Sequence, residues 1–287
     1  APRCEKNGLG STGVTQELVD AFYMKDGLPI SATAYLPQST LYQEEGYGTY
    51  KDQNDNFSKK YTNVSVSNRY LNREPRFYNT VFFNGRQWPV SCNQVLFYNG
   101  GNSGVQEGQA TLTGYMLFKR FNRSVSLTNP GVASQFRPSI IFRLADFYLM
   151  YAEAANEVNP NDVRVLKYLN LVRERAGLPG VETLNPAIRG NQELQRAAIQ
   201  RERQVELATE GQRYFDVRRW MIADKNGEGR QNGYAHGMNV RGEPNDIDDF
   251  NRVVEASQIV FNRKMYLYPM PDSEMRKTKN LVQNPGW

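Results

Sequence analysis

The clearest periodic pattern of hydrophobic and polar residues lies in the second half of the chain. After Pro138 the apolar side chains recur at helical spacing, at Ile140, Ile141, Leu144, Phe147, Tyr148 and Tyr151. This spacing is typical of a helix with one apolar face. Pro160 ends that helix, and Asp162 is a candidate N-cap for a second helix that Gly177 closes. The pattern therefore predicts two antiparallel helices over residues 140–177, the size of one tetratricopeptide unit.

Further elements are expected toward the C-terminus. The sequence predicts long helices over 192–210 and 212–223, separated by a glycine. Residues 225–249 are rich in glycine and asparagine and are expected to form a loop. A strand is predicted over 265–270, where prolines end it, and a short helix over 272–277.

The first part of the chain, to about residue 137, has a different pattern. Glycine, proline, asparagine and serine recur every few residues there, which is typical of turns and loops. Only residues 16–24 have a helical pattern. Short apolar segments that are predicted to be strands lie at 80–83, 94–98 and 116–118. We therefore expect an irregular, ligand-binding part, residues 1–137, followed by a helical part with terminal loops, residues 138–287.

Residues 197–220 carry charges on every face of the predicted helices. A solvent-exposed helix separates its polar and apolar faces, so some of these charges must be buried, and buried charges need partners. Glu206 lies three residues after Arg203, within side-chain reach. We predict a half-buried structural ion network that includes Arg203, Glu206, Arg213 and Asp216. The alternative is an arginine-rich helix that binds an acidic partner, but acids nearly match the bases in number.

Composition limits the classes of function. The chain has 287 residues, of which 39% are hydrophobic, and a net charge of +5. It could form one large or two modest domains, and it has no apolar run long enough to cross a bilayer. The charge is mild and no continuous Lys/Arg tract occurs, so we expect no nucleic-acid partner. The single histidine, His236, leaves no histidine cluster for zinc and is expected to be a hydrogen-bonded loop residue.

The two cysteines and the N-terminus carry little functional signal. Cys4 and Cys92 could pair only if the fold brings them together, which the sequence does not decide. A lipidation site needs an apolar stretch and a small residue before the cysteine, whereas Arg3 precedes Cys4. The first residues also lack the charged and apolar regions of a secretory leader.

Aromatic residues in the irregular part give the best signal of ligand binding. The tyrosines Tyr35, Tyr42, Tyr47, Tyr50 and Tyr61 fall in a segment full of glycine, glutamine, asparagine and aspartate, with Trp88 further on. Sugars present C–H faces that stack on flat rings, and polar side chains bind their hydroxyl groups. Arg69 could also reach a ligand. The alternative is that these rings pack the loops onto the core.

Metal binding and catalysis have weaker support. Residues 52–56 resemble a calcium loop, but an EF-hand would need glycine at position 57 and glutamate at position 63. A looser oxygen-rich site there stays open. Asp246, Asp248 and Asp249 are expected to lie in a solvated loop. No motif selects the two carboxylates that glycoside hydrolysis needs, so we expect no enzyme, no catalytic residue, no metal and no cofactor.

Five segments in the same order resemble the SusD/RagB family of outer-membrane nutrient-binding lipoproteins of Bacteroidetes. These segments are Thr15–Phe22, Asn72–Tyr78, Arg143–Ala154, Ala197–Trp220 and the ending Gln283–Trp287. Together they cover nearly the whole chain. The resemblance implies a mainly α, SusD-like fold, in which a tetratricopeptide-type helix pair and further helices pack with an irregular part that contains short strands. It also implies that Arg73 and Arg76 are structural.

The resemblance implies binding rather than catalysis. Family members hold a nutrient, here expected to be a glycan, at the cell surface and deliver it to a SusC-like TonB-dependent transporter. The protein is then expected on the outer membrane, facing outward, with membrane contact only through an N-terminal lipid anchor absent from this chain. A peptide-binding member of the family and a protein-binding helical-repeat scaffold are the alternatives.

Family members are roughly twice as long as this chain. We therefore expect a fragment of a longer precursor, in which apolar side chains of the helix pair are either more exposed than core residues should be or covered by another chain. The candidates for such exposure are Phe147, Tyr148, Leu166 and Leu169.

Overall fold

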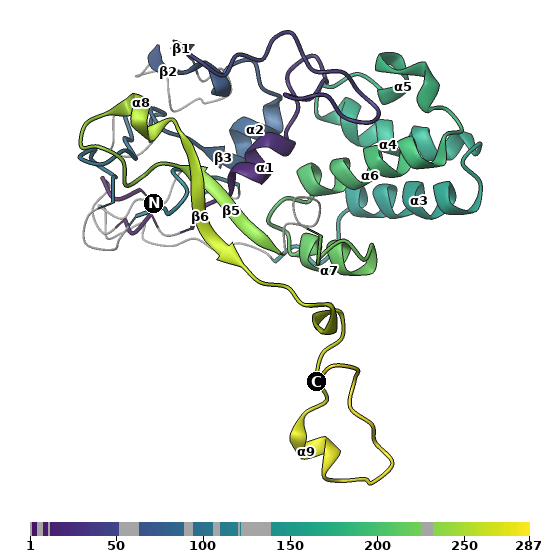
Figure 1. Cartoon of the computed structure of the whole chain (residues 1–287). Coiled ribbons are helices and arrows are strands. Elements are labelled where there is room, and N and C mark those ends of the chain that lie inside the picture. Colours follow the sequence, from purple (N-terminus) through teal and green to yellow (C-terminus); the bar gives the residue numbers. More distant parts are fainter. Residues whose placement is uncertain are drawn as a thin grey trace.

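Three helices pack together at one end of the molecule, namely α3 (Leu144–Val158), α4 (Val163–Arg175) and α6 (Gln192–Glu206) (Figure 1). The short helices α5 (Val181–Leu184) and η4 (Pro186–Ile188) connect α4 to α6. The computed structural model describes residues 2–4, 8–10, 12–51, 63–88, 94–105, 110–119, 121, 139–225 and 232–287.

The predicted antiparallel helix pair is confirmed. The Asp162 side chain accepts a hydrogen bond from the backbone N–H of Arg164 and so caps α4, and Gly177 adopts the left-handed conformation with φ of +81°. Leu149 of α3 and Leu169 of α4 are fully buried in one hydrophobic cluster. The apolar periodicity of the sequence therefore reports the packed face of both helices.

The helices are shorter than predicted, and the backbone shows why. Arg143 is extended, with φ of −146°, so α3 begins at residue 144 rather than 140. Thr209 has φ of +63°, and α6 has already ended at Glu206 instead of continuing to 210. Helix α7 (Gln212–Arg219) likewise stops before Met221, whose φ is +55°. Positive φ is incompatible with a right-handed helix.

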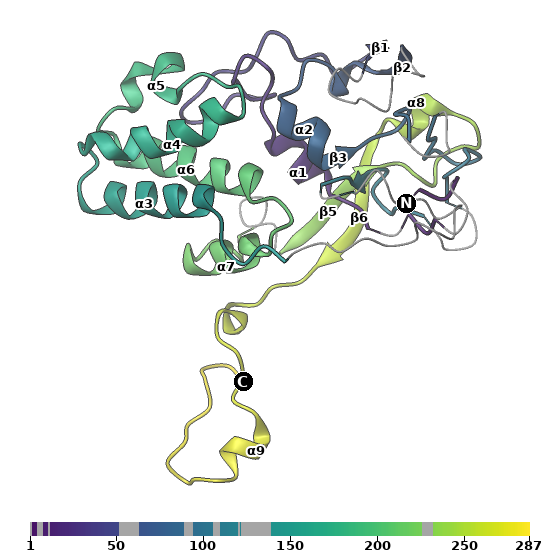
Figure 2. The ribbon, with the colours of Figure 1, turned by 180° about the vertical axis from the view of Figure 1, so that it is seen from behind.

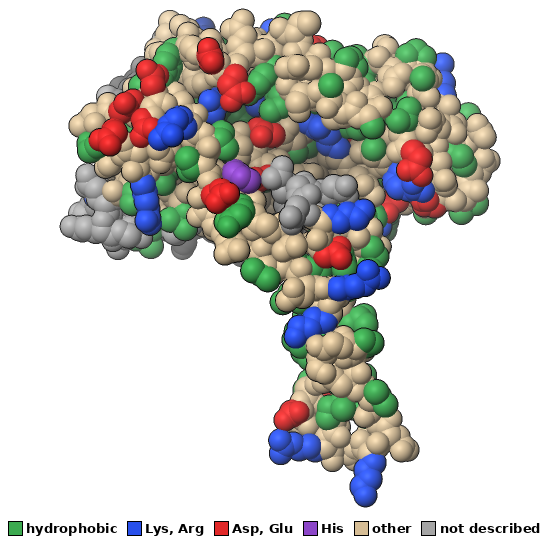
Figure 3. Space-filling model, in the orientation of Figure 1, with side chains coloured by type: hydrophobic (Ala, Val, Ile, Leu, Met, Phe, Trp, Pro, Cys, Tyr) green, Lys and Arg blue, Asp and Glu red, His purple; other side chains and the backbone are tan. Residues whose placement is uncertain are grey.

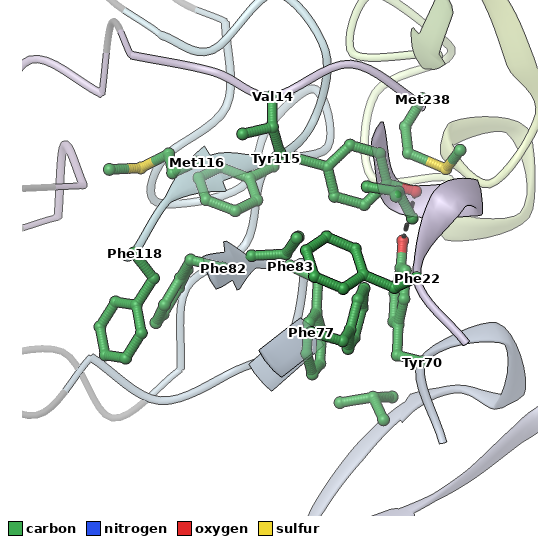
Figure 4. Close-up of a cluster of buried hydrophobic side chains, with 14 of the residues drawn as sticks. Val14, Phe22, Tyr70, Phe77, Phe82, Phe83, Tyr115, Met116, Phe118 and Met238 are labelled. Carbon is green, nitrogen blue, oxygen red and sulfur yellow. Dashed lines mark hydrogen bonds between the residues drawn. The ribbon is translucent and has the colours of Figure 1, made fainter. Parts of the chain in front are cut away.

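The irregular part forms its own aromatic core beside the helical end. It contains α1 (Gln16–Ala21), η2 (Asn68–Tyr70) and α2 (Pro75–Thr80), with two small antiparallel sheets, β1 (Tyr47–Tyr50) with β2 (Val64–Ser67) and β3 (Val81–Phe82) with β4 (Met116–Leu117). Figure 4 shows its buried rings gathered between these elements. The rings of Tyr70 and Phe83 stack with centroids 4.5 Å apart. The predicted strands at 80–83 and 116–118 are thus present in short form.

A long hairpin was missed by the sequence pattern. Strands β5 (Gly233–Met238) and β6 (Val253–Ile259) pair antiparallel, and α8 (Ile247–Phe250) lies between them in sequence, so the prediction of a loop over 225–249 is wrong for β5 and α8. Two glycines weaken the strand signal of β5. Gly237 is required because a Cβ there would lie 2.5 Å from the Cα of Thr113. The hairpin also supplies Met238 and Phe250 to the aromatic core.

Two other strand predictions are wrong. Residues 94–98 are not a strand. Val95 bonds the backbone of Gly85 and Arg86, but the backbone N–H of Phe97 donates to the Asn84 side chain at 2.7 Å and that of Leu96 to Asn102 at 2.9 Å, which stops the pairing. The segment 265–270 is not a strand, since η5 (Arg263–Tyr266) occupies its start. The predicted terminal helix is present as α9 (Asp272–Met275).

The C-terminal segment that carries α9 projects from the rest of the molecule, which is clear in Figure 1 and from behind in Figure 2. In contrast, η5 contacts the residues that follow α7, because the Tyr266 hydroxyl donates to Oδ1 of Asp224 at 2.5 Å. On the helix pair, Phe147 is 53% exposed, whereas Tyr148 and Leu166 are partly buried and Leu169 is fully buried. The expected exposure therefore holds for Phe147 and is wrong for Leu169. No described helix is long and apolar enough to cross a membrane.

Candidate functional site

Strand β1 directs one tyrosine to the core and another to the surface. Successive side chains of a strand point alternately to opposite faces of the sheet. Tyr47 and Tyr50 are three positions apart on β1 and therefore face in opposite directions. Tyr50 is buried and its ring stacks on that of Tyr78 with centroids 5.3 Å apart. Tyr47 is 43% exposed. Of these two rings, that of Tyr47 has a face available to a ligand.

The hydroxyl of Tyr47 is fixed by two residues at α8. It donates to Oδ1 of Asp248 at 2.7 Å and accepts from Nδ2 of Asn251 at 2.9 Å. Burial, together with the hydrogen bond to Asp248, raises the pKa of Tyr47 to about 12. The hydroxyl therefore stays protonated near pH 7, and the exposed ring is held in one position.

Two cavities meet at Tyr47. The first has a volume of about 320 Å³, and its lining includes Glu44, Glu45, Arg69, Asp248 and Arg252. The second has a volume of about 270 Å³, and its lining includes Ser65, Tyr70, Asn84, Gln94 and Tyr98. Tyr47, Ser67 and Asn251 line both cavities. Ligand pockets usually measure about 300–1,000 Å³, so the adjoining cavities together suit a small extended ligand.

Arg69 lines the first cavity, although only 6% of the residue is exposed. Its Nη2 donates to the backbone oxygen of Asn251 at 2.9 Å and lies 3.6 Å from Oε1 of Glu44. Its Nε has no hydrogen-bond partner among the described residues. The Nε is itself buried, so Arg69 is held at the wall of the cavity by Asn251 and Glu44.

The other predicted aromatic residues do not come together at this site. Tyr35 is buried and its hydroxyl lies 2.9 Å from that of Tyr23. Trp88 is buried against Phe121, with ring centroids 4.3 Å apart. With Tyr50, these rings have the core-packing role that was the alternative interpretation.

Two further candidates stand apart from this core. Tyr42 is partly buried and its hydroxyl donates to Glu44 at 3.3 Å, close to the first cavity. Tyr61 and the possible calcium loop at residues 52–56 lie outside the described residues.

Sequence reasoning missed the residues that hold Tyr47. Asp248 was assigned to a solvated loop, and Asn251 was not singled out. Both follow β5 in the chain and lie about 200 residues from Tyr47 in sequence. No local motif marks them, because the hydrogen bonds form only when the β5–β6 hairpin folds back onto the irregular part.

The predicted ion network consists of two clusters. In the first, Nε of Arg203 donates to Asp216 at 2.9 Å and Nη1 donates to Asp146 at 3.1 Å, with all three side chains almost fully buried. Burial lowers the pKa of Arg213 to about 10, although the charge of Asp216 acts in the opposite direction. Arg203 thus joins α6 to α3 and α7.

The second cluster surrounds Glu206, which is not paired with Arg203 as the spacing suggested. Arg76 donates to it at 3.0 Å, and Arg143 and Arg175 contact it as well. Burial alone would raise the pKa of Glu206, but the hydrogen bond from Arg143 and the nearby positive charges lower it to about 2. These charges are satisfied by the protein, which favours a structural role over ligand binding.

The remaining candidate chemistry is structural as well. Nδ1 of His236 lies 2.7 Å from Oε1 of Glu17, which links β5 to α1. Cys4 is disulfide-bonded, and the other cysteine of the chain, Cys92, lies outside the described residues. Within the described part of the chain, no group of three or more His, Cys, Asp or Glu residues is placed to hold a metal ion.

Comparisons of the sequence and of the structure with known proteins both match SusD-like proteins. The sequence profile of the SusD family matches residues 2–287. SusD-like protein P2 of Formosa agariphila is 31% identical over 151 residues, which represent 52% of this chain and 26% of that protein.

Among solved structures, a SusD-like protein of Bacteroides fragilis NCTC 9343 (BF3747) superposes with a TM-score of 0.68 and 30% identity, over 96% of this chain and 47% of that one. A SusD-like carbohydrate binding protein of the same strain (BF0978) gives a TM-score of 0.62 and 22% identity, over 93% and 48% of the two chains. The chain thus spans about half the length of these structures.

Proposed function

The chain belongs to the SusD family, and from this premise we propose that it is part of a cell-surface protein that binds a glycan without catalysis. The observation that supports a glycan is the fixed, exposed ring of Tyr47 between two cavities whose linings include polar side chains. A sugar ring stacks on such a face, and its hydroxyl groups pair with the amide, hydroxyl and carboxylate groups of the lining. The carbohydrate binding named for the structurally similar protein BF0978 is consistent with a glycan ligand here.

The proposed ligand is longer than a single sugar unit. Tyr47, Ser67 and Asn251 line both cavities, so a ligand that stacks on the Tyr47 ring can extend into each of them. Each cavity alone is at or below the lower end of the usual size of a ligand pocket. An oligosaccharide therefore uses the site more fully than a monosaccharide, and its affinity should rise with chain length.

The test is calorimetric titration with a panel of oligosaccharides, using two tyrosine variants that differ only in position. Tyr47→Ala removes the ring between the cavities and should weaken binding at least about tenfold, equivalent to about 1.4 kcal/mol. Tyr234→Ala is the matched control, because Tyr234 is 44% exposed but lies on β5 and lines neither cavity. Its affinity for the sugar should not change.

The alternatives give different outcomes. A protein-binding scaffold would bind none of the oligosaccharides. A peptide-binding member of the family would bind extended peptides instead, with the same dependence on Tyr47. The assignment of the site to Tyr47 would be contradicted if both variants lost sugar binding equally, or if neither variant lost it.

We further propose that the whole protein is lipid-anchored at the outer membrane, faces outward and passes its ligand to a SusC-like TonB-dependent transporter. The support is membership of the family. Co-purification of the full-length protein with a TonB-dependent transporter, after extraction of the outer membrane with a mild detergent, tests the partnership. Recovery of the protein without any such transporter would contradict it.

A further inference from the structure

The charges at the two cavities restrict the class of sugar. The lining of the second cavity includes no charged side chain among the described residues. The first cavity is lined by three carboxylates, those of Glu44, Glu45 and Asp248, and by two guanidinium groups, those of Arg69 and Arg252, which gives a net charge of −1. The chain as a whole has a net charge of +5. The negative excess is therefore a local property of this site.

Both guanidinium groups already have acidic neighbours. Arg69 lies 3.6 Å from Glu44 and donates to the backbone of Asn251. Arg252 donates from Nε to Oδ1 of Asp249 at 2.6 Å. The Nε of Arg69 is buried, and the positive charge of this residue is balanced by Glu44. Neither arginine is thus available as the counter-ion of an anionic ligand.

The backbone at α8 provides no anion site either. The carboxylate of Asp246 accepts hydrogen bonds from the N–H groups of Asp248 and Asp249, so these donors are occupied. Glu243 and Asp246, which precede α8 in the chain, are also exposed. Figure 3 shows acidic side chains gathered over the end of the molecule that carries β1 and α8. An approaching anion would meet a surface of its own sign.

We infer that the Tyr47 site binds an uncharged sugar and rejects sugars that carry carboxylate or sulfate groups. This inference rests on the proposed glycan-binding function. A neutral sugar needs only the ring face of Tyr47 and hydrogen-bonding groups, and the cavities supply both. A sugar carboxylate or sulfate would be partly desolvated beside three carboxylates and would find no unpaired cation among the described lining residues, which is unfavourable.

The test compares neutral and anionic oligosaccharides of equal length by calorimetric titration. The neutral probes are hexasaccharides of glucose, galactose, mannose and xylose, and the anionic probes are hexasaccharides of galacturonate, mannuronate and sulfated galactose. At about 20 mM salt the best neutral probe should bind at least about tenfold tighter than any anionic one. At about 500 mM salt this ratio should shrink, because salt screens the repulsion.

A pair of variants connects the ratio to the site. The double variant Glu44→Gln, Glu45→Gln removes two of the three carboxylates and should reduce the neutral-to-anionic ratio at least about threefold. Glu274→Gln on α9 removes one exposed carboxylate that does not line either cavity and should leave the ratio unchanged.

Each outcome decides the question. Tight binding of a uronate or sulfated probe, equal to or above that of the neutral probes, overturns this inference and leaves glycan binding intact. A ratio that is insensitive to both salt and the double variant also overturns it, because the selectivity would not be electrostatic. Absence of binding to every probe overturns the proposed function and this inference with it.

Discussion

Glu206 is the residue whose replacement tests the buried ion network most sharply. Its side chain is almost fully buried and is contacted by Arg76, Arg143 and Arg175. Its pKa falls from 4.5 to about 2, and at about 1.4 kcal/mol for each tenfold change in proton affinity this corresponds to about 3 kcal/mol of folding free energy at pH 7. Glu206→Gln keeps the size of the side chain and removes the charge.

The partners of Glu206 explain why the expected loss is not larger. Removal of one partner of a buried ion pair costs about 3–5 kcal/mol when the other charge is left alone. Here Arg76 keeps Glu74 and Arg143 keeps Glu210 as neighbouring carboxylates. Glu206→Gln should therefore lower the free energy of unfolding at pH 7 by about 3 kcal/mol, with a decrease in Tm of about 6–12 °C.

The pH dependence provides an internal check. Because the pKa of Glu206 is lower in the folded state than in the unfolded state, its stabilising effect is fully present above about pH 4.5 and disappears as the pH falls toward about 2. The difference in unfolding free energy between the wild-type protein and Glu206→Gln should therefore shrink between these pH values. Chemical denaturation at a series of pH values measures it.

The control for this prediction is an ion pair in solvent. Glu274 pairs with Lys277 at 2.6 Å, and both side chains are at least half exposed. Glu274→Gln should cost no more than about 1 kcal/mol at any pH. An equal effect of the two substitutions at pH 7, or a deficit for Glu206→Gln that does not change down to pH 2, would refute the linkage between the lowered pKa and stability.

Three further substitutions test other parts of the fold. Arg203→Met leaves two buried aspartates without this partner and should reduce the free energy of unfolding by about 3–5 kcal/mol in denaturant titrations, whereas unchanged stability would show that the charges are solvated. Asp162→Ala removes the N-cap of α4 and should cost about 1 kcal/mol, which Asp162→Asn should largely restore. Gly237→Ala places a methyl group 2.5 Å from the Cα of Thr113 and should lower Tm measurably, and a wild-type Tm would show that the hairpin can move.

At the helical end, local sequence patterns predicted the helices but not their exact ends. Apolar spacing predicted the α3–α4 pair, and Asp162 and Gly177 marked its connection and its end, because caps and helix faces depend on residues a few positions apart. The exact ends of α3 and α6 were not predictable in the same way. They depend on the extended backbone of Arg143, whose side chain bonds Glu206 and Glu210, and on the positive φ of Thr209.

The ion network illustrates the same division. The mixed charges of residues 197–220 predicted that some must be buried. The spacing of Arg203 and Glu206 suggested that they pair with each other, but each has partners on other elements. Only the packing of α6 against α3 and α7, and of α2 and α4 near its end, brings these partners close. A sequence pattern can require that a buried charge be paired without identifying its partner.

The candidate site depends most on the tertiary structure. The sequence identified a group of aromatic residues suited to sugars, including Tyr47 and Arg69, but it could not separate exposed rings from those in the core. The pairing of β1 with β2 turns Tyr50 inward and Tyr47 outward, and the β5–β6 hairpin then places Asp248 and Asn251 at the Tyr47 hydroxyl. Composition and order along the chain thus determined the family and the kind of ligand to expect. The pairing of β1 with β2 decided which ring faces solvent, and contacts between residues about 200 positions apart decided which groups surround it, because both form only when the chain folds.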